Sequence, residues 1–373
     1  MVIAVTLLHG GDGRAQDLSV DQQKAISAIE KIGAKVTLKT VDGDVATEVF
    51  LSDSLCDDLD AAFALLPDLP CCHVVTAYWA SVSDKELAHL AGLHDLEVLE
   101  LSIAITGQSS EITDVGLFYL RDLPQLRTLS LAKTQITDAG LIQLRSLRRL
   151  EKLDISQTMV GNDGIAHLRQ LESLKTLNLS GTNINDDGLI HVGKLRSLET
   201  LSLSATPVSG TGLPHLYGLE RLTDCDLTAT DITDVICSKL IGLKRLKSLS
   251  LSHTRITDDA CSHLVRLPNL KSLELYWTFI TDEGASKIRQ ASPQTKVDVR
   301  TRLPDEDVAA ITQLLKTKHA FKGKILGMEV LESGDVEVMT GVIRGPLDGA
   351  GATFRLRKMK NKWKVVERGS WVS

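Results

Sequence analysis

A 24-residue period of leucines dominates the hydrophobic pattern in the middle of the chain. Seven leucines open seven successive units without a slip: Leu126, Leu150, Leu174, Leu198, Leu222, Leu246 and Leu270. In the first of these units, Leu129 and Leu131 alternate with polar residues, which predicts a short strand that buries both leucines. Thr137-Asp138 then provides a helix N-cap before Leu141 and Leu144. The pattern therefore predicts strand–helix units whose strands stack in parallel.

The array extends beyond these seven units. A unit that opens at Leu96 is six residues longer than the others, and more degenerate units precede it back to residue 48. About ten units are thus expected in residues 48–300. Each unit buries its apolar side chains only against its neighbours, so we expect cooperative folding and a cap at each end. A threonine after each strand, such as Thr134, is expected to satisfy backbone groups that would otherwise be buried without a partner.

The repeat resembles the leucine-rich repeat family and its ribonuclease-inhibitor-like superfamily. Its pattern is L-x-x-L-x-L-x-x-T-x-I-T-D-x-G-L, with threonine where the family often has asparagine or cysteine. The 24-residue form is similar to tandem repeats abundant in certain bacterial proteins. The resemblance implies an α/β solenoid with a parallel β-sheet on the concave face and helices on the convex face. It also implies a scaffold for protein–protein interaction.

Segments of different character flank the array. Residues 18–47 are predicted to form an N-terminal cap, with a helix after Ser19 and a hairpin turn at Asp42-Gly43. Residues 1–17 are either a signal-peptide remnant or a disordered N-terminus, and both interpretations stay open. Residues 305–373 predict a small α+β domain, one helix followed by an antiparallel sheet. This order of elements is similar to that of cystatin-like and NTF2-like domains.

Composition and charge narrow the class of protein. The chain has 373 residues, of which 43% are hydrophobic, and this excludes general disorder. No apolar run is long enough for a membrane-spanning helix. The net charge of -6 argues against a nucleic-acid ligand. Residues 301–373 carry 13 Lys and Arg against 9 Asp and Glu, whereas residues 1–300 carry 29 against 39. We expect a monomer, while exported, cell-envelope and cytoplasmic locations all stay open.

Three repeated residue types are candidates for chemistry, and each has a structural explanation. A histidine column is expected to face solvent beside the helices: His89, His167, His191, His215 and His263. An aspartate column is expected to cap helices: Asp84, Asp114, Asp138, Asp186, Asp234, Asp258 and Asp282. Five of the six cysteines fall on core positions and are expected to be buried: Cys56, Cys72, Cys225, Cys237 and Cys261. We therefore expect no metal, no cofactor and no catalytic residue.

The candidate partner-binding residues are aromatic or lie in the six-residue insertion. Aromatic side chains anchor many interfaces, and they cluster early at Tyr78 and Trp79 and late at Tyr276 and Trp277. The alternative is that they shield the ends of the array. The insertion at residues 104–109, with Ala104, Ile105 and Gln108, is either a binding loop or a neutral surface insertion. Six basic residues also predict a basic hairpin in the C-terminal domain: Arg355, Arg357, Lys358, Lys360, Lys362 and Lys364.

The resulting hypothesis is a non-enzymatic solenoid that binds a protein or peptide partner. A rigid extended surface without a catalytic grouping favours binding over catalysis. The alternative hypothesis places the active part in the C-terminal domain, which would bind a small ligand or a toxin-like partner with the repeats as scaffold. That alternative requires an apolar cavity lined by Val308, Ile311, Phe354 and Trp363, and a filled core at these residues would dismiss it.

Overall fold

The computed structural model describes residues 18–41, 44–52, 56, 58–78, 80–102, 110–300, 305–318, 324–330, 335–345, 348–360 and 362–372. Contacts within the chain divide it into two units, Met1–Asp231 with Gly242–Lys247, and Ile232–Ile241 with Ser248–Ser373. Residues 1–17 and the predicted domain boundary at residues 301–304 lie outside the described ranges. The domain boundaries stay predictions.

The predicted N-terminal helix and hairpin are confirmed. Helix α1 (Val20–Lys31) begins at a reciprocal capping box, in which Gln22 N donates to Ser19 Oγ at 3.1 Å and Ser19 N donates to Gln22 Oε1 at 2.9 Å. Strands β1 (Lys35–Val41) and β2 (Asp44–Leu51) pair antiparallel. The turn residues Asp42 and Gly43 themselves lie outside the described ranges. The hairpin places β2 as the first strand onto which the parallel ladder is built.

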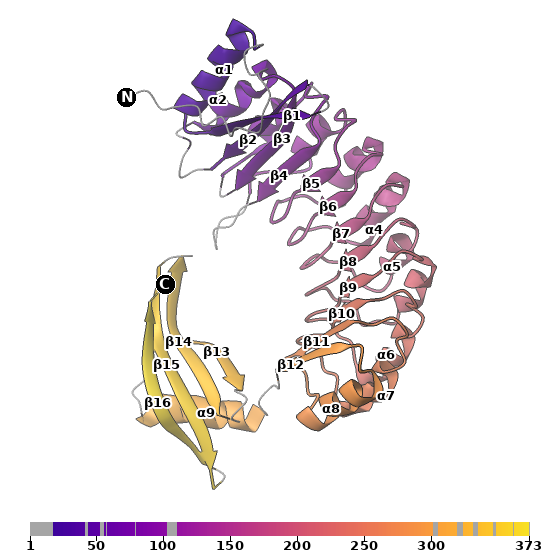
Figure 1. Cartoon of the computed structure of the whole chain (residues 1–373), viewed down its shortest axis with the longest axis vertical. Helices are drawn as coiled ribbons and strands as arrows, with labels where there is room; N and C mark the ends of the chain where they lie inside the picture. Colours follow the sequence, from indigo (N-terminus) through magenta and orange to yellow (C-terminus); the bar gives the residue numbers. More distant parts are fainter. Residues whose placement is uncertain are drawn as a thin grey trace. The chain divides into compact units, whose positions relative to one another are not determined.

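One short strand per unit builds the parallel sheet (Figure 1). The sheet has twelve strands in chain order from β1 to β12, and the pairs from β2–β3 to β8–β9, together with β10–β11 and β11–β12, are parallel. In the larger of the two compact units, which contains residues 1–231, these strands are β3 (Cys72–Tyr78), β4 (Val98–Ser102), β5 (Thr128–Ser130), β6 (Lys152–Asp154), β7 (Thr176–Asn178), β8 (Thr200–Ser202) and β9 (Asp224–Asp226). In the second they are β10 (Ser248–Ser250), β11 (Ser272–Tyr276) and β12 (Lys296–Arg300). The strands predicted from the leucine alternation are confirmed.

Short helices form the second layer within each unit. The first unit has α2 (Leu59–Ala64), α3 (Asp84–Ala88), α4 (Asn162–Ile165) and α5 (Leu189–Val192), with 3-10 helices at Leu66–Asp68, Gly116–Leu120, Gly140–Ser146, Ala166–Gln170 and Leu213–Gly218. The second unit has α6 (Asp234–Leu240), α7 (Cys261–Leu264) and α8 (Asp282–Ala291), with a 3-10 helix at Asp258–Ala260. None of these helices has the length and apolar character needed to cross a bilayer.

The core of the array is the repeated leucine set, sealed at each strand end by a threonine. Leu129, Leu131 and Leu141 are at most 1% exposed, and their counterparts in the following units are buried in the same way. Each buried threonine donates its hydroxyl to the carbonyl three residues earlier at 2.5–2.9 Å: Thr134, Thr158, Thr182, Thr206, Thr230, Thr254 and Thr278. This confirms the prediction that the threonine satisfies a buried backbone group.

The residue just before each threonine has a left-handed backbone. Its φ is positive at Lys133, Gln157, Gly181, Ala205, Ala229, His253 and Trp277. Such a φ is disfavoured for residues with a Cβ and free of strain for glycine. Only Gly181 in this column is a glycine, so the other six positions hold the chain in a turn that local preference opposes.

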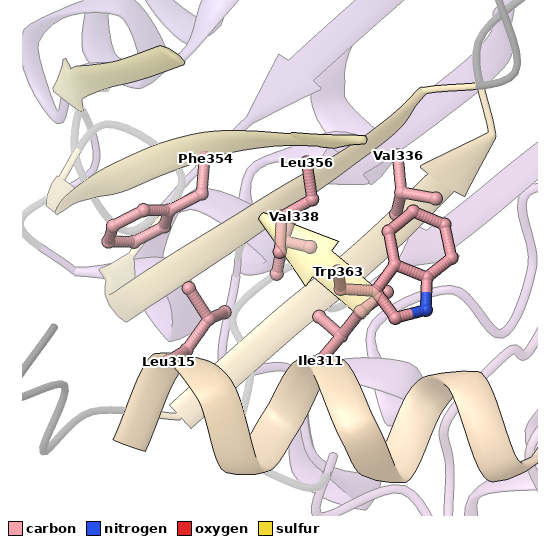
Figure 2. Packing of buried hydrophobic residues seen from close by; sticks show 7 residues of the cluster. All are labelled: Ile311, Leu315, Val336, Val338, Phe354, Leu356 and Trp363. Atoms are coloured by element: carbon pink, nitrogen blue, oxygen red, sulfur yellow. The ribbon is translucent and has the colours of Figure 1, made fainter. Parts of the chain in front are cut away.

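The C-terminal segment has the predicted helix followed by an antiparallel sheet, which has four strands. Helix α9 (Asp305–Lys318) precedes the antiparallel sheet β13 (Lys324–Val330), β14 (Val336–Gly345), β15 (Asp348–Met359) and β16 (Lys362–Val372). Figure 2 shows Ile311 and Leu315 of the helix facing side chains of the sheet. Phe354 and Trp363 are buried in this same cluster, at 2% and 9% exposure. The similarity to cystatin-like and NTF2-like domains stays a prediction.

That packing bears on the alternative ligand cavity. Ile311, Phe354 and Trp363, three of the four residues expected to line it, pack together as a filled core. The side chain of the fourth, Val308, lies outside the described residues. A filled core at these residues argues against an apolar ligand cavity, and the core is filled at the three described positions.

Candidate functional site

In the larger compact unit, which contains residues 1–231, the exposed face of the parallel sheet presents aligned rows of side chains to solvent. We call this surface the strand face. Residues between the buried leucines point outward because side chains alternate along a strand. The strand pairing aligns one row across eight strands, which we call the central row: Phe50, Thr76, Glu100, Ser130, Asp154, Asn178, Ser202 and Asp226. The row is polar along most of its length and holds an aromatic side chain, Phe50, on β2, where its register partner on β1 is Lys35.

Hydrogen bonds fix the orientation of the polar groups in the central row. Asp154 and Asp226 each accept from the backbone N–H two residues later, at 2.9 Å, and Asn178 does the same at 3.1 Å. Ser202 Oγ donates to Asp226 Oδ2 at 3.1 Å. These donors are neutral, so they hold the carboxylates in place and leave their negative charge intact.

Tyr78 forms the aromatic end of the strand face together with Phe50. Their ring centroids are 6.0 Å apart with the planes tilted by 54°, and Tyr78 is 37% exposed. The Tyr78 hydroxyl donates to Glu100 Oε2. This hydrogen bond, followed by burial and the negative charge of Glu100, raises the pKa of Tyr78 to about 12. The phenol therefore stays protonated and offers its ring rather than an ionised oxygen.

The other predicted binding residues have different surroundings. Trp79, Ala104, Ile105 and Gln108 lie outside the described residues. Tyr276 ends β11 and is half-buried, and its N–H donates to Ser252 Oγ at 3.2 Å. Trp277, also half-buried, stacks on His253 with ring centroids 6.0 Å apart and planes 24° apart. Trp277 is thus partnered within the repeats, and the two interpretations of this aromatic cluster both stay predictions.

Sequence reasoning missed Phe50 and Glu100 as companions of Tyr78. Phe50 lies between the buried residues Val49 and Leu51, and Glu100 lies between Leu99 and Leu101. That alternation assigns both to the solvent face of their strands. Glu100 pairs with Thr76 at the regular offset of 24 residues, so the repeat period was a signal that could have placed it beside Tyr78. Phe50 pairs with Thr76 at an offset of 26 residues after a register shift, and the period does not predict that pairing.

Every member of the aspartate column except Asp282 accepts a hydrogen bond from the following repeat instead of capping its own helix, which corrects the sequence prediction. Asp114 accepts from Thr137 N at 2.8 Å and from Thr137 Oγ1 at 2.6 Å. Equivalent pairs form at Asp84, Asp186, Asp234 and Asp258 with the unit that follows each of them. The first N–H groups of a helix lack an internal partner, and the preceding unit supplies it.

This clamp also explains the glycine of the repeat motif. A Cβ at Gly140 would overlap Asp114 Oδ1 and lie 2.8 Å from Leu117 Cδ1. The carboxylate can approach only because the glycine has no side chain. At Asp186, burial pushes the pKa upward, but hydrogen bonds from Gly212 and Ser209 outweigh it and the pKa is lowered. The column is therefore committed to stacking the units.

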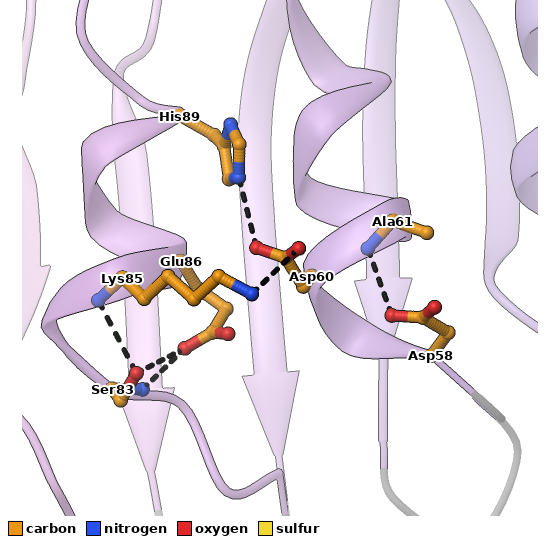
Figure 3. Close-up of polar contacts among 7 residues, drawn as sticks. All are labelled: Asp58, Asp60, Ala61, Ser83, Lys85, Glu86 and His89. Carbon is orange, nitrogen blue, oxygen red and sulfur yellow. Dashed lines mark hydrogen bonds and ion pairs between the residues drawn. The ribbon is translucent and has the colours of Figure 1, made fainter.

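A polar cluster near the N-terminal end of the array is also explained by helix ends (Figure 3). Asp60 lies 2.9 Å from Lys85 Nζ and 3.0 Å from His89 Nε2. The hydrogen bonds from Lys85 and then His89 lower the pKa of Asp60. Ala61 N donates to Asp58 at 3.0 Å, and Ser83 and Glu86 form a capping box at α3. The cluster fastens α2 to α3, and its histidine is the first of the predicted column.

The thiols are structural. The five cysteines predicted to be buried are buried, and all six cysteines are thiols. Burial raises the pKa of Cys72, Cys225 and Cys237 to about 12 and that of Cys261 to about 11. A thiol with so high a pKa is a poor nucleophile and a poor metal ligand near neutral pH. Within the described ranges, no three His, Cys, Asp or Glu side chains form a group that could hold a metal ion.

The predicted basic hairpin is partly neutralised, because three of its six basic residues pair with carboxylates of the same chain. Arg357 forms a bidentate pair with the buried Asp335 at 2.7 and 2.8 Å. Lys358 lies 2.7 Å from the buried Asp307, and Arg355 lies 3.2 Å from Glu367. The exposed remainder is Lys360, Lys362 and Lys364.

Comparison with known proteins matches three segments to the leucine-rich repeat family, residues 123–144, 170–192 and 266–288. No curated protein sequence matches the chain. Among solved structures, the chain is similar to the internalin InlF of Listeria monocytogenes at 18% identity, covering 77% of this chain and 90% of that one, with a TM-score of 0.47. It is similar to internalin C2 of the same organism at 26% identity, covering 49% and 76%, with a TM-score of 0.39. A third structure is the leucine-rich repeat ectodomain of the Arabidopsis receptor kinase HAESA with a peptide hormone, at 19% identity, 70% and 43% coverage and a TM-score of 0.48.

Proposed function

We propose that this chain, which is a leucine-rich repeat protein, is a non-catalytic scaffold that binds a protein or peptide partner across its strand face. The observation that carries the proposal is the aromatic end of that face. Tyr78 and Phe50 offer stiff aromatic surface beside rows of small polar groups. Partly exposed aromatic side chains in such settings are the ones that contribute most to binding energy.

The hydrogen bonds and ion pairs of the titratable side chains support binding over catalysis. Five members of the aspartate column hold the next unit through its N–H and hydroxyl groups. Asp60 is shared by Lys85 and His89, and the buried thiols have pKa values of about 11 to 12. Catalysis requires such groups to be aimed at a common point where a substrate can sit. Here these aspartates fasten one element to another, and the thiols stay protonated in the core.

The test is quantitative affinity capture with the full chain and three variants. Tyr78→Ala should lose the partner, with its Kd raised about tenfold or more once the partner is purified. Tyr78→Phe keeps the ring and should retain most of the affinity. Tyr217→Ala is the matched control, because Tyr217 is 42% exposed but belongs to the helical layer. A partner set that is the same for Tyr78→Ala and the unmodified chain would count against the proposal.

The organisation around this face completes the proposal. We propose a monomer with an N-terminal cap at 18–47, repeats at 48–300 and a separate C-terminal domain at 305–373. The filled core formed by Ile311, Phe354 and Trp363 supports a structural role for that domain rather than a ligand cavity. Sedimentation of the full chain across a range of concentrations would test the monomer, since a dimer would sediment faster as concentration rises.

A further inference from the structure

Acidic side chains outnumber basic ones on the strand face of the first unit. From β2 to β9 its rows carry five carboxylates, Glu48, Glu100, Asp154, Asp224 and Asp226, against one basic residue, Lys152, and β1 adds Lys35 opposite Phe50 and Lys39. Glu48 pairs with Lys39 of the neighbouring strand at 2.6 Å. The other four accept hydrogen bonds only from neutral donors, so far as the described residues show. Glu100, Asp154, Asp224 and Asp226 therefore have no basic partner among the residues that the structure describes.

The basic residues at the edge of the face do not offset this charge. Arg127 lies 3.5 Å from Glu97 and 2.7 Å from Glu151, and Lys175 lies 2.5 Å from Glu151. The hydrogen bonds from Lys175 and then Arg127 lower the pKa of Glu151, which keeps it ionised. This edge column of alternating charge is thus balanced within itself. The field over the adjacent strand face stays negative, and complementary charge would be attracted to it.

The carboxylates of the central row are spaced for an extended chain. Neighbouring strands lie about 4.8 Å apart, so Glu100 on β4 and Asp154 on β6 are separated by about 10 Å, and Asp154 and Asp226 on β9 by about 14 Å. An extended peptide advances about 3.3 Å per residue. Basic residues about three and then about four positions apart would reach the three carboxylates in turn. From Phe50 to Asp226 the row spans roughly 34 Å, or about ten extended residues.

The aromatic end gives such a segment a direction. Phe50 and Tyr78 lie at the β2–β3 end of the rows, and Glu100 is the first carboxylate beside them. An apolar side chain that packs on the two rings would set the register of the charges that follow. We infer that the partner contacts this face through an extended, basic segment that carries an aromatic or aliphatic residue at one end. This inference rests on the proposed function and names the chemistry of its partner.

The experiment is selection from a displayed library of random peptides of about 12 residues, a length that covers the row, with the full chain as the immobilised target. We expect the enriched peptides to carry net positive charge with an aromatic or aliphatic residue near one end. Their Kd, measured by fluorescence anisotropy, should rise several-fold between about 0.05 and about 0.3 M salt, because screening weakens attraction between exposed charges.

Charge variants on the strand face provide the decisive comparison. The double variant Asp154→Asn with Asp226→Asn should weaken the selected peptides roughly 3- to 10-fold. Asparagine preserves the hydrogen-bond acceptor, as Asn178 already does at the same position. Lys152→Glu should act in the opposite direction and tighten binding about 2- to 5-fold. Asp187→Asn is the matched control, an exposed aspartate outside the strand face, and should change nothing.

The outcomes separate the inference from the proposed function. Enriched peptides that are neutral or acidic, or that bind the double asparagine variant as tightly as the unmodified chain, overturn the inference and leave the scaffold proposal standing. A library from which the chain enriches nothing overturns the inference as well. The scaffold proposal is then decided separately, by whether Tyr78→Ala loses the partner found by affinity capture.

Discussion

Replacing Asp114 by alanine tests whether the aspartate column clamps adjacent units. The side chain accepts two hydrogen bonds from the following unit, at 2.8 Å from Thr137 N and 2.6 Å from Thr137 Oγ1. The contact is part-buried. Alanine would leave the N–H and the hydroxyl without these acceptors at a helix start, where no backbone partner is available.

The expected cost follows from the character of the two bonds. A hydrogen bond to a charged acceptor contributes about 1.5–3 kcal/mol, and the loss of an N-cap acceptor costs about 0.5–2 kcal/mol. Partial access of water to the site compensates some of the loss, so we expect Asp114→Ala to lower the free energy of unfolding by about 2–4 kcal/mol. Asp114→Asn should cost less. The chain already uses an amide in this column, where Asn162 accepts from Asn185 N at 3.1 Å and donates to Asn185 Oδ1 at 2.7 Å.

Urea unfolding at neutral pH measures the cost, with Asp282→Ala as the matched control. Asp282 is the last member of the column and begins its own helix α8, so it loses only the favourable charge at that helix start, about 0.3–1 kcal/mol. A double-mutant cycle of Asp114→Ala with Thr137→Ala should give a coupling of about 1 kcal/mol or more. If Asp114→Ala and Asp282→Ala lowered the free energy of unfolding equally, without coupling between Asp114 and Thr137, Asp114 would not join adjacent repeats. The original prediction, that it caps its own helix, would then stand.

Three further predictions concern stability. Ala205→Gly should raise the free energy of unfolding by roughly 0.5–1 kcal/mol, because φ is +53° there; a destabilised variant in the same urea assay would contradict this. Burial pushes the pKa of Asp307 upward, but hydrogen bonds from Lys358 and Trp363 outweigh it, and the pKa is lowered. The ionised Asp307 therefore stabilises the folded protein fully above the carboxyl pKa of the unfolded chain, about 3.9, and this stabilisation is lost as pH falls through the pKa of the folded state. Calorimetry of the full chain should show acid destabilisation that Asp307→Asn reduces; an unchanged pH dependence would argue against it. Leu201→Asp puts a charge in the shared core and should remove hydrogen-exchange protection across β7–β9, whereas loss confined to β8 would exclude cooperative stacking.

Much of the fold follows from the order of residues within one repeat. Leu129 and Leu131 are inward because a strand alternates its side chains, and Thr134 bonds a carbonyl only three residues away. These contacts are local, so the period of the sequence is enough to predict them. The same holds for the capping box at Ser19. The choice of Tyr78 as a binding residue also came from its type and position, and it stays a prediction.

What the tertiary structure alone decided is which units and strands meet, and there the predictions were incomplete or wrong. Asp114 was assigned to its own helix but accepts from Thr137, 23 residues later. Arg357 was assigned to a basic hairpin, and the sequence did not reveal its partner, Asp335. The neighbours of Tyr78 depended likewise on strand register. The physical reason is that periodicity reports which face of an element is apolar, whereas a polar side chain selects its partner by the offset at which elements stack, and that offset is fixed only when the whole array packs.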